Sequence, residues 1–122
     1  MTYKKLKKRL DEVFSLYIRL RDKNKVCISC GKKSDNKEAG HFYSRSVLSL
    51  RWDGDNVNGQ CVYCNQNLKG NLPGYENGII QRYGRGVLDR LERTSSMQVK
   101  FKIFELSDMI DIYEEKIKKI FN

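Results

Sequence analysis

The chain has 122 residues and carries 24 lysines and arginines against 15 aspartates and glutamates, so its formal charge is +9. Nine glycines and one proline exclude a collagen-like chain, and the lack of a long apolar run excludes a membrane-spanning helix. A basic folded domain most often binds nucleic acid and less often an anionic membrane surface. We therefore expect a nucleic-acid partner and no membrane.

The basic charge is concentrated in the first half of the chain, which begins with a predicted helix over residues 3–22. Residues 1–61 carry 14 basic and 7 acidic side chains, whereas residues 96–122 carry 5 of each. Six apolar side chains recur at helical spacing in the first segment and predict a face packed on the core: Leu6, Leu10, Val13, Phe14, Tyr17 and Ile18. The basic residues on the opposite side of this helix either form a solvated face or contact phosphates.

The four cysteines form two Cys-x-x-Cys pairs, separated by a 30-residue insert: Cys27 and Cys30, then Cys61 and Cys64. The basic N-terminal stretch lacks the apolar segment of a secretory signal, so disulfides are not expected. Four thiolates in two such pairs can form a tetrahedral zinc site, and a zinc ion would stabilise a chain that is poor in apolar residues. The alternatives are a redox-active pair or buried free thiols.

The insert and the segment after it give weaker signals of local structure. Residues 38–52 contain Phe42, Val47, Trp52 and other apolar side chains, which favour an extended or irregular buried backbone over a helix. The Asp-Gly-Asp-Asn sequence at residues 53–56 predicts a turn. The second cysteine pair is expected to open a short helix that ends near Gly70.

The rest of the chain is predicted to be helical. We expect Pro73 and Gly74 to break the chain, followed by a helix over 75–83 that Gly84 ends and another over 86–93. Ser95 or Ser96 is predicted to cap the last helix. The apolar set of this helix is Met97, Phe101, Phe104, Met109, Ile110, Tyr113, Ile117, Ile120 and Phe121.

The insert also carries the only histidine, His41, which lies between the two cysteine pairs. Asn56 follows just before the second pair, and Asn65 follows directly after its last cysteine. If one zinc ion holds both pairs, the strand with His41 and the helix that starts at Asn65 must lie side by side. A single histidine in a short chain is otherwise most often a surface or core residue.

This order of His, Asn and a potential metal ligand after a cysteine pair resembles the HNH, or His-metal finger, nucleases. The stretch DNVNGQCVYCN, residues 55–65, resembles the segment of these nucleases that runs from the loop asparagine to the zinc knuckle. Cys64 followed directly by Asn65 is similar to phage endonuclease VII, a junction resolvase with a four-cysteine zinc. The resemblance narrows to the phage NinG/Rap family of recombination nucleases. It rests on FSLYIRLRDKNKVCISCG, AGH, LRWD and QCVYCNQNLKGN, in that order, and spans roughly residues 13–90.

The resemblance implies an α+β fold, mostly helical overall, with a small zinc-stapled ββα-metal core. We predict three parts of a single domain. Residues 1–24 form a basic amphipathic helix, residues 25–72 form the zinc-bound nuclease core, and residues 73–122 form helices that pack on it.

The resemblance also assigns roles to the residues of the insert. His41 would be the general base, Asn65 a ligand of a catalytic Mg²⁺ or Mn²⁺, and Asn56 the loop residue that orients the histidine. A plain turn asparagine is the alternative for Asn56. Many relatives carry an Asp directly before the His as a second metal ligand, but this chain has Gly40 there. Glu38 is the nearest carboxylate, and it would need a bend at Gly40 to join the site, because residues 38 and 41 of a regular strand face opposite ways.

Three basic side chains are candidates for phosphate contacts: Arg45, Arg51 and Lys69. For the two arginines, ion pairs with Asp53 or Asp55 are the alternative. The function that the resemblance implies is a metal-dependent endonuclease that cuts branched DNA, such as Holliday junctions and D-loops, during phage recombination.

Such a nuclease would act in the cytoplasm of the host bacterium, and symmetric cutting of a junction would favour a homodimer. The alternative function is a non-catalytic zinc module that binds nucleic acid or a protein partner.

Overall fold

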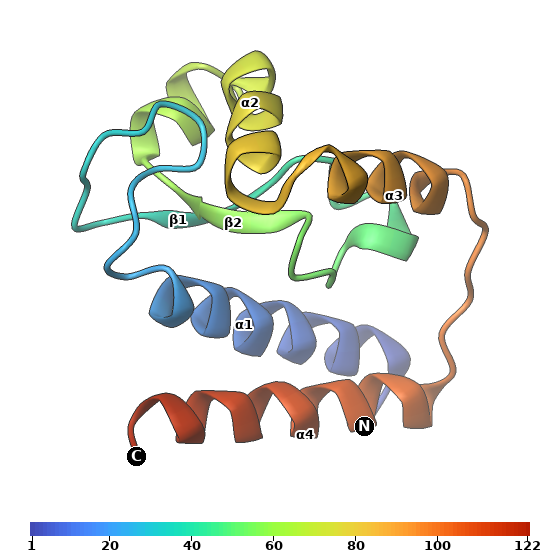
Figure 1. Ribbon diagram of the computed structural model, residues 1–122. Helices are drawn as coiled ribbons and strands as arrows, with labels where there is room; N and C mark the ends of the chain where they lie inside the picture. Colours follow the sequence, from blue (N-terminus) through green and yellow to red (C-terminus); the bar gives the residue numbers. More distant parts are fainter.

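The computed structural model describes residues 1–122 and has four α-helices, two short strands and two shorter helical turns (Figure 1). In chain order the elements are α1 (Tyr3–Arg21), β1 (Glu38–His41), η1 (Leu48–Leu50), β2 (Val57–Gln60), η2 (Tyr63–Asn67), α2 (Leu72–Tyr83), α3 (Arg85–Ser95) and α4 (Ile103–Ile120). The expected mixture of a small sheet with mostly helical structure is therefore confirmed.

The two strands pair antiparallel and form the only sheet. Glu38 lies opposite Gln60, and His41 lies opposite Val57. The sheet lies between α1 on one side and α2 on the other (Figure 1). The short π-helical turn η2 follows β2 directly, so that Asn65 enters a helix just beyond the sheet.

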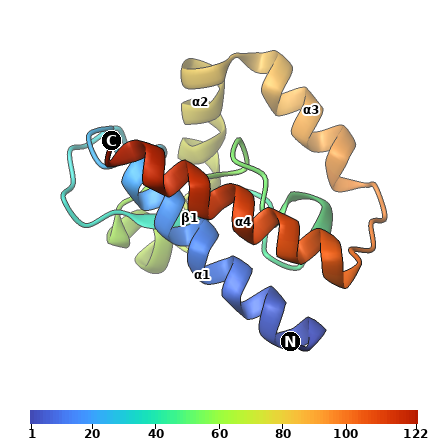
Figure 2. The same ribbon diagram turned by 90° about the horizontal axis from the view of Figure 1, so that it is seen from below.

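Helix α1 packs along α4, and the two helices run in the same direction (Figure 2). Its apolar stripe is buried as predicted, with Leu6, Leu10, Val13, Phe14 and Ile18 in one core with Leu106 and Ile110 of α4. Tyr17 packs against the edge of this core. Because this core also contains Trp52 and Val57, α1 is fixed to the insert as well as to α4.

A second core lies on the other side of the sheet. It joins Tyr75 and Ile79 of α2 and Leu88 and Leu91 of α3 to Ile28 and Leu50. Gly74 and Gly78 let α2 approach the first cysteine pair closely, because a Cβ atom on either glycine would collide with the carbonyl oxygen of Ser29 or Ile28. The backbone around Cys27 is therefore supported from the side that faces α2.

A buried ion pair fixes the end of α1 to β2. The carboxylate of Asp22 is fully buried and accepts hydrogen bonds from Arg21 Nε at 2.7 Å and from the Gly59 N–H at 2.7 Å. Arg21 also donates to the carbonyl oxygens of Gly54 and Val57. Burial by itself would raise the pKa of Asp22, but the Arg21 guanidinium and the Gly59 amide lower it below its usual value.

Within residues 38–52, predicted to be extended or irregular, only Glu38–His41 form a strand, and the rest is irregular apart from η1. The chain then turns and forms η1, because its apolar side chains divide between the two cores. Leu50 enters the core formed with α2 and α3, whereas Trp52 enters the core formed with α1 and α4. The predicted turn at residues 53–56 is present, and Asp53 Oδ1 accepts a hydrogen bond from the Asp55 N–H.

Two helix boundaries were predicted wrongly. Pro73 and Gly74 lie in the first turn of α2, where the missing N–H of proline costs nothing, and Asn71 caps the helix. Ser95 and Ser96 do not cap the last helix, because their hydroxyls donate to the carbonyl oxygens of Glu92 and Arg93 at the end of α3. Helix α4 begins after Lys102, and Met97 is 62% exposed outside it.

No helix combines the length and the apolar composition that crossing a membrane would require.

Candidate functional site

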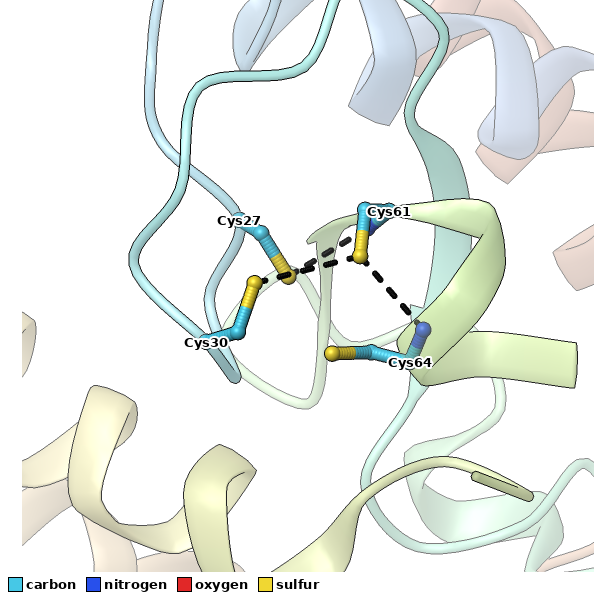
Figure 3. Close-up of side chains that lie close together, drawn as sticks. All are labelled: Cys27, Cys30, Cys61 and Cys64. Carbon is cyan, nitrogen blue, oxygen red and sulfur yellow. Dashed lines mark hydrogen bonds between the residues drawn. The ribbon is translucent and has the colours of Figure 1, made fainter. Parts of the chain in front are cut away.

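The two cysteine pairs meet at one point of the structure (Figure 3). The four sulfur atoms all lie within 4.8 Å of one another, and Cys30 Sγ lies 3.9 Å from Cys61 Sγ. A tetrahedral zinc site with Zn–S bonds of about 2.3 Å places its sulfurs roughly 3.8 Å apart. The four thiols are therefore close enough to hold one zinc ion, as the spacing of the cysteines predicted.

Hydrogen bonds from the surrounding backbone fit this cluster to thiolates. Cys27 Sγ accepts from the N–H groups of Ser29 and Cys61 at 3.4 and 3.3 Å, and Cys64 Sγ accepts from the Asn71 side chain at 3.4 Å. Burial opposes ionisation of Cys27, but the neighbouring amides lower its pKa to about 7. Burial raises the pKa of Cys64 to about 12, a cost that a divalent cation bound among the thiolates would offset.

His41 and Asn65 line the same cleft, which has a volume of about 840 Å³. Helix α1 contributes Asp11, Glu12, Phe14, Ser15 and Arg19 to its wall, and the insert and the segment after it contribute Ala39, His41, Ser44, Arg45, Ser46, Asn65, Lys69 and Gly70. The structure thus brings together two of the three residues with an expected catalytic role. Helix α1, which was assigned only core packing and a possible phosphate-binding face, forms one side of the cleft.

His41 is half-buried, and one of its ring nitrogens has a fixed partner. Nε2 lies 3.0 Å from the carbonyl oxygen of Arg51. A carbonyl oxygen only accepts hydrogen bonds, so Nε2 carries the proton of the neutral ring and Nδ1 is the basic nitrogen. Burial lowers the pKa of His41 below its usual value of 6.5, and the positive charge of Arg45 lowers it further. The hydrogen bond to the Arg51 carbonyl oxygen acts in the opposite direction and offsets part of this decrease.

Asn56 lies outside the cleft and is fully buried. Its Nδ2 donates to the carbonyl oxygens of Tyr43 and Leu50, both at 3.0 Å, and its Oδ1 accepts from the Tyr43 N–H at 2.8 Å. The side chain thereby joins the two ends of the loop between β1 and Arg51. Any effect of Asn56 on His41 through hydrogen bonds is exerted by way of this loop, because no hydrogen bond links the two side chains.

The amide of Asn65 has one free end. Its Nδ2 donates to Glu38 Oε1 at 2.9 Å, and the same carboxylate accepts two bonds from Gln66 Nε2, at 3.0 and 2.8 Å. These contacts fix the orientation of the amide and leave Oδ1 without a partner in the chain. Glu38 itself does not line the cleft that His41 lines.

The space that a side chain at position 40 would occupy is filled by Gln60. A Cβ atom on Gly40 would collide with Gln60 Oε1, an oxygen that is fully buried and has no hydrogen-bond partner. Gly40 also pairs regularly with Asn58, so the bend that would carry Glu38 toward His41 is absent. The chain therefore offers no carboxylate directly before His41, and Gln60 occupies the place where one would begin.

The arginines of the insert bind an acid that the sequence did not reveal. Arg45 and Arg51 form ion pairs with Asp11 of α1, at 2.7 and 2.6 Å, and not with Asp53 or Asp55. Those two aspartates bind Arg90 of α3 instead. The alternative of ion pairs within the insert is therefore wrong, because the loop turns its arginines toward α1.

The cations of the cleft differ in how free they are. Arg51 is 15% exposed and paired, whereas Arg45 is 59% exposed and pairs only through Nη2. Lys69 and Arg19 line the cleft and form no ion pair or side-chain hydrogen bond. Arg19 was missed because its position on a basic helix looked like part of a solvated face, and only the packing of α1 against the sheet places it here.

A family model described as "Bacteriophage Lambda NinG protein" matches residues 2–122. The chain is 32% identical to Protein ninG of Escherichia phage 933W over 117 residues, which cover 94% of this chain and 58% of that protein. It is 32% identical to Protein ninG of Escherichia phage lambda, over 94% of this chain and 57% of that protein. It is 31% identical to Protein ninG of Salmonella phage P22, over 93% of this chain and 56% of that protein. The chain thus spans a little over half the length of these relatives. No solved structure matches it.

The cysteine cluster predicts one tightly bound zinc ion per chain. The zinc ion would join residues 27–30 to residues 61–64, so removing it with a chelator should unfold the insert. The melting temperature should fall by more than 10 °C, which circular dichroism would measure. Metal content would be measured by mass spectrometry of the intact protein. In the zinc-loaded protein all four thiols should resist alkylation, whereas one rapidly alkylated pair, or an unchanged fold after complete zinc loss, would contradict the assignment.

The environment of His41 predicts that its imidazole titrates below 6.5 in the protein without DNA or free divalent cations. The pKa of His41 is lower in the folded protein than in the unfolded chain, so the unfolded chain binds the proton at a higher pH. The protein should therefore lose stability as the pH falls through the pKa of the unfolded histidine. The chain has a single histidine, so one NMR titration of the imidazole resonances measures this pKa directly. A pKa at or above 6.5 would show that the ring is not held as described.

Proposed function

Because the chain belongs to the NinG family of bacteriophage proteins, we propose that it is a metal-dependent endonuclease that hydrolyses phosphodiester bonds in branched DNA. In this function residues 38–67, with their two strands and the short helix η2, correspond to the ββα unit of the His-metal finger nucleases. The cysteine cluster joins the chain before this unit, at Cys27 and Cys30, to its second half, at Cys61 and Cys64.

The observation that carries the proposal is the shared cleft of His41 and Asn65. One is a neutral base with a free Nδ1, and the other is an amide with a free Oδ1. Arg19, Arg45 and Lys69 line the same cleft. A base, an oxygen ligand and cations around one open space are what hydrolysis of a phosphodiester requires.

The chemistry begins with proton transfer to His41. Nδ1 accepts a proton from a water molecule as the water oxygen attacks phosphorus. The bond from phosphorus to the 3′ oxygen breaks, and the 3′ oxygen leaves with the bonding electrons and takes a proton from solvent water. The positive charge on the ring is then stabilised by the Arg51 carbonyl oxygen, which accepts from Nε2. Because burial keeps His41 neutral at pH 7, the base is available without prior deprotonation.

Asn65 is the residue that would hold a divalent cation. Mg²⁺ and Mn²⁺ prefer oxygen ligands, and the free Oδ1 of Asn65 is such an oxygen. A bound cation would neutralise charge on the phosphate and on the leaving oxygen. Glu38 supports this site by orienting the amide of Asn65, and the remaining ligands would be water and DNA oxygens, since Gln60 fills the space before His41.

The basic side chains divide into two groups. Arg19 and Lys69 are unpaired in the cleft, and Arg45 has a free edge, so these three are the proposed phosphate contacts. Arg51 is nearly buried and holds Asp11, so we assign it a role inside the protein instead. Contacts to phosphate carry no sequence information, which fits recognition of DNA by its branched shape.

Cleavage of a synthetic four-way junction tests the catalytic assignment. With Mg²⁺ or Mn²⁺, His41→Ala should lower the single-turnover rate by 10²–10⁴-fold, the usual contribution of a general base. Asn65→Ala should lower it by about 10² or more, because a cation at the leaving oxygen is worth several kcal/mol. Asn67→Ala is the matched control, since Asn67 lies on the same turn but outside the cleft and should leave the rate unchanged.

The catalytic proposal fails if the wild-type protein leaves junctions, D-loops and linear duplexes intact with both metals across a range of salt concentrations. It also fails if His41→Ala and the wild type cleave at the same rate.

Binding of the uncleaved junction tests the cationic contacts. Arg19→Ala and Lys69→Ala, each made in the His41→Ala background, should each weaken binding and reduce the slope of log K against log salt concentration by about 1. Arg93→Ala removes the same charge from α3, which lies beside α2, and should change neither quantity because Arg93 does not line the cleft (Figure 1). Equal effects of all three substitutions would show that binding depends on net charge and not on the cleft.

One observation favours a second candidate function. Because Gln60 closes the place before His41, the chain lacks the carboxylate ligand common in the resembled class, and a zinc module that binds DNA without cutting it would need no such ligand. This function predicts junction binding that is unchanged in Asn65→Ala and no cleavage.

A further inference from the structure

We propose that Asp11 is a positioning residue that keeps the proton of neutral His41 on Nε2, acting through Arg51. The catalytic value of this arrangement rests on the proposed function, but the position of the proton can be measured in the free protein. Asp11 lies on α1, forms no hydrogen bond with His41 or with any cysteine, and has no part in the chemistry described above.

Four donors satisfy the Asp11 carboxylate. Oδ1 accepts from Arg51 Nε at 3.0 Å and from Trp52 Nε1 at 2.9 Å. Oδ2 accepts from Arg51 Nη2 at 2.6 Å and from Arg45 Nη2 at 2.7 Å. The carboxylate lines the cleft, yet with both oxygens occupied it is not a free ligand for a divalent cation.

All four donors belong to one short segment of the insert, Arg45–Trp52. The carbonyl oxygen that receives Nε2 of His41 lies in the same segment, on Arg51 itself. The Asp11 carboxylate binds the side chains of Arg51 and of the next residue, Trp52, and so restrains the peptide group between them, which carries this oxygen. From the other side Asn56 holds the carbonyl oxygen of Leu50, so the segment is fixed at two points.

The charge of Asp11 serves the same arrangement. Burial alone would raise the pKa of Asp11, but the hydrogen bonds from Arg51 and Trp52 lower it, so the carboxylate is ionised at neutral pH. The side chain of Arg51 is only 15% exposed, and without Asp11 it would be a nearly buried cation without a partner. We expect it then to move toward water and to take its own carbonyl oxygen away from His41.

The tautomer of His41 tests the proposal in the zinc-loaded protein without DNA or free divalent cations. At pH 8 the long-range ¹H–¹⁵N couplings of this single imidazole should show the Nε2-H form to be dominant. Asp11→Asn should reduce the ratio of the Nε2-H to the Nδ1-H form about tenfold, the value of one hydrogen bond. Glu12→Gln is the matched control, since it removes the same charge from the neighbouring residue of the same cleft and should leave the ratio unchanged.

A second variant guards against misfolding of the first. Arg51→Gln keeps the carbonyl oxygen but removes the partner of Asp11, and it should shift the tautomer ratio as Asp11→Asn does. An unchanged ratio in either variant, with zinc content and helix content retained, overturns the proposal. If neither variant folds, slow hydrogen exchange at Arg51 Nε and Trp52 Nε1 in the wild type supports the network, and rapid exchange at both overturns it.

Cleavage separates this proposal from the proposed function. If the wild type cuts junctions, Asp11→Asn should slow single-turnover cutting of the fully bound junction about tenfold relative to Glu12→Gln, which removes the same charge from the same cleft. A shifted tautomer in a protein that cuts nothing would leave the positioning role standing and the nuclease assignment refuted. Normal cutting with an unshifted tautomer would refute the positioning role alone.

Discussion

The convergence of the two cysteine pairs is the constraint on which the rest of the site depends. One pair precedes the insert and the other follows it, so the cluster brings the two ends of the insert close together. The antiparallel pair of β1 and β2 lies within this closed segment, and η2, which contains Asn65, follows β2 directly, near the strand that carries His41. A zinc ion would stabilise this closure, because metal binding adds directly to the free energy of folding. This contribution matters in a chain with only 39% hydrophobic residues.

Side chains from α1, from the insert itself and from α2 hold the backbone of the insert in place. Asp11 binds the segment that contains Arg51, Asn56 binds the ends of the loop, and Tyr75 of α2 donates to the carbonyl oxygen of Gly40 at 2.6 Å. Each of these groups is polar and supports backbone, and of the three only Asp11 also lines the cleft. The backbone that they fix supplies the partner of His41 Nε2, so the basic nitrogen, Nδ1, is set by groups that do not touch the ring.

The sequence predicted the parts of the molecule in which local chemistry decides the outcome. The helical stripe of α1 and the four-cysteine cluster follow from spacing alone. The start of α2 was predicted wrongly because proline was taken as a break, although it suits a first helical turn behind the Asn71 cap. The start of α4 was predicted wrongly because the hydroxyls of Ser95 and Ser96 bond backward to α3. Asp11 and Arg19 could not be assigned to the site from the sequence, since only the packing of α1 against the insert brings them to the cleft. Likewise, nothing local to Gly40 shows that Gln60, from the paired strand, fills the space before His41.

The central claim is that a divalent cation binds at Asn65, beside His41, at a place distinct from the zinc among the cysteines. A crystal structure of the His41→Ala protein with a four-way junction and Mn²⁺ would test it most directly, with anomalous diffraction recorded at the zinc and manganese edges. We predict zinc among Cys27, Cys30, Cys61 and Cys64, and manganese within bonding distance of Asn65 Oδ1 and of a phosphate oxygen of the DNA. A bound junction with manganese absent from Asn65, or a DNA backbone that passes outside the cleft, would contradict the account.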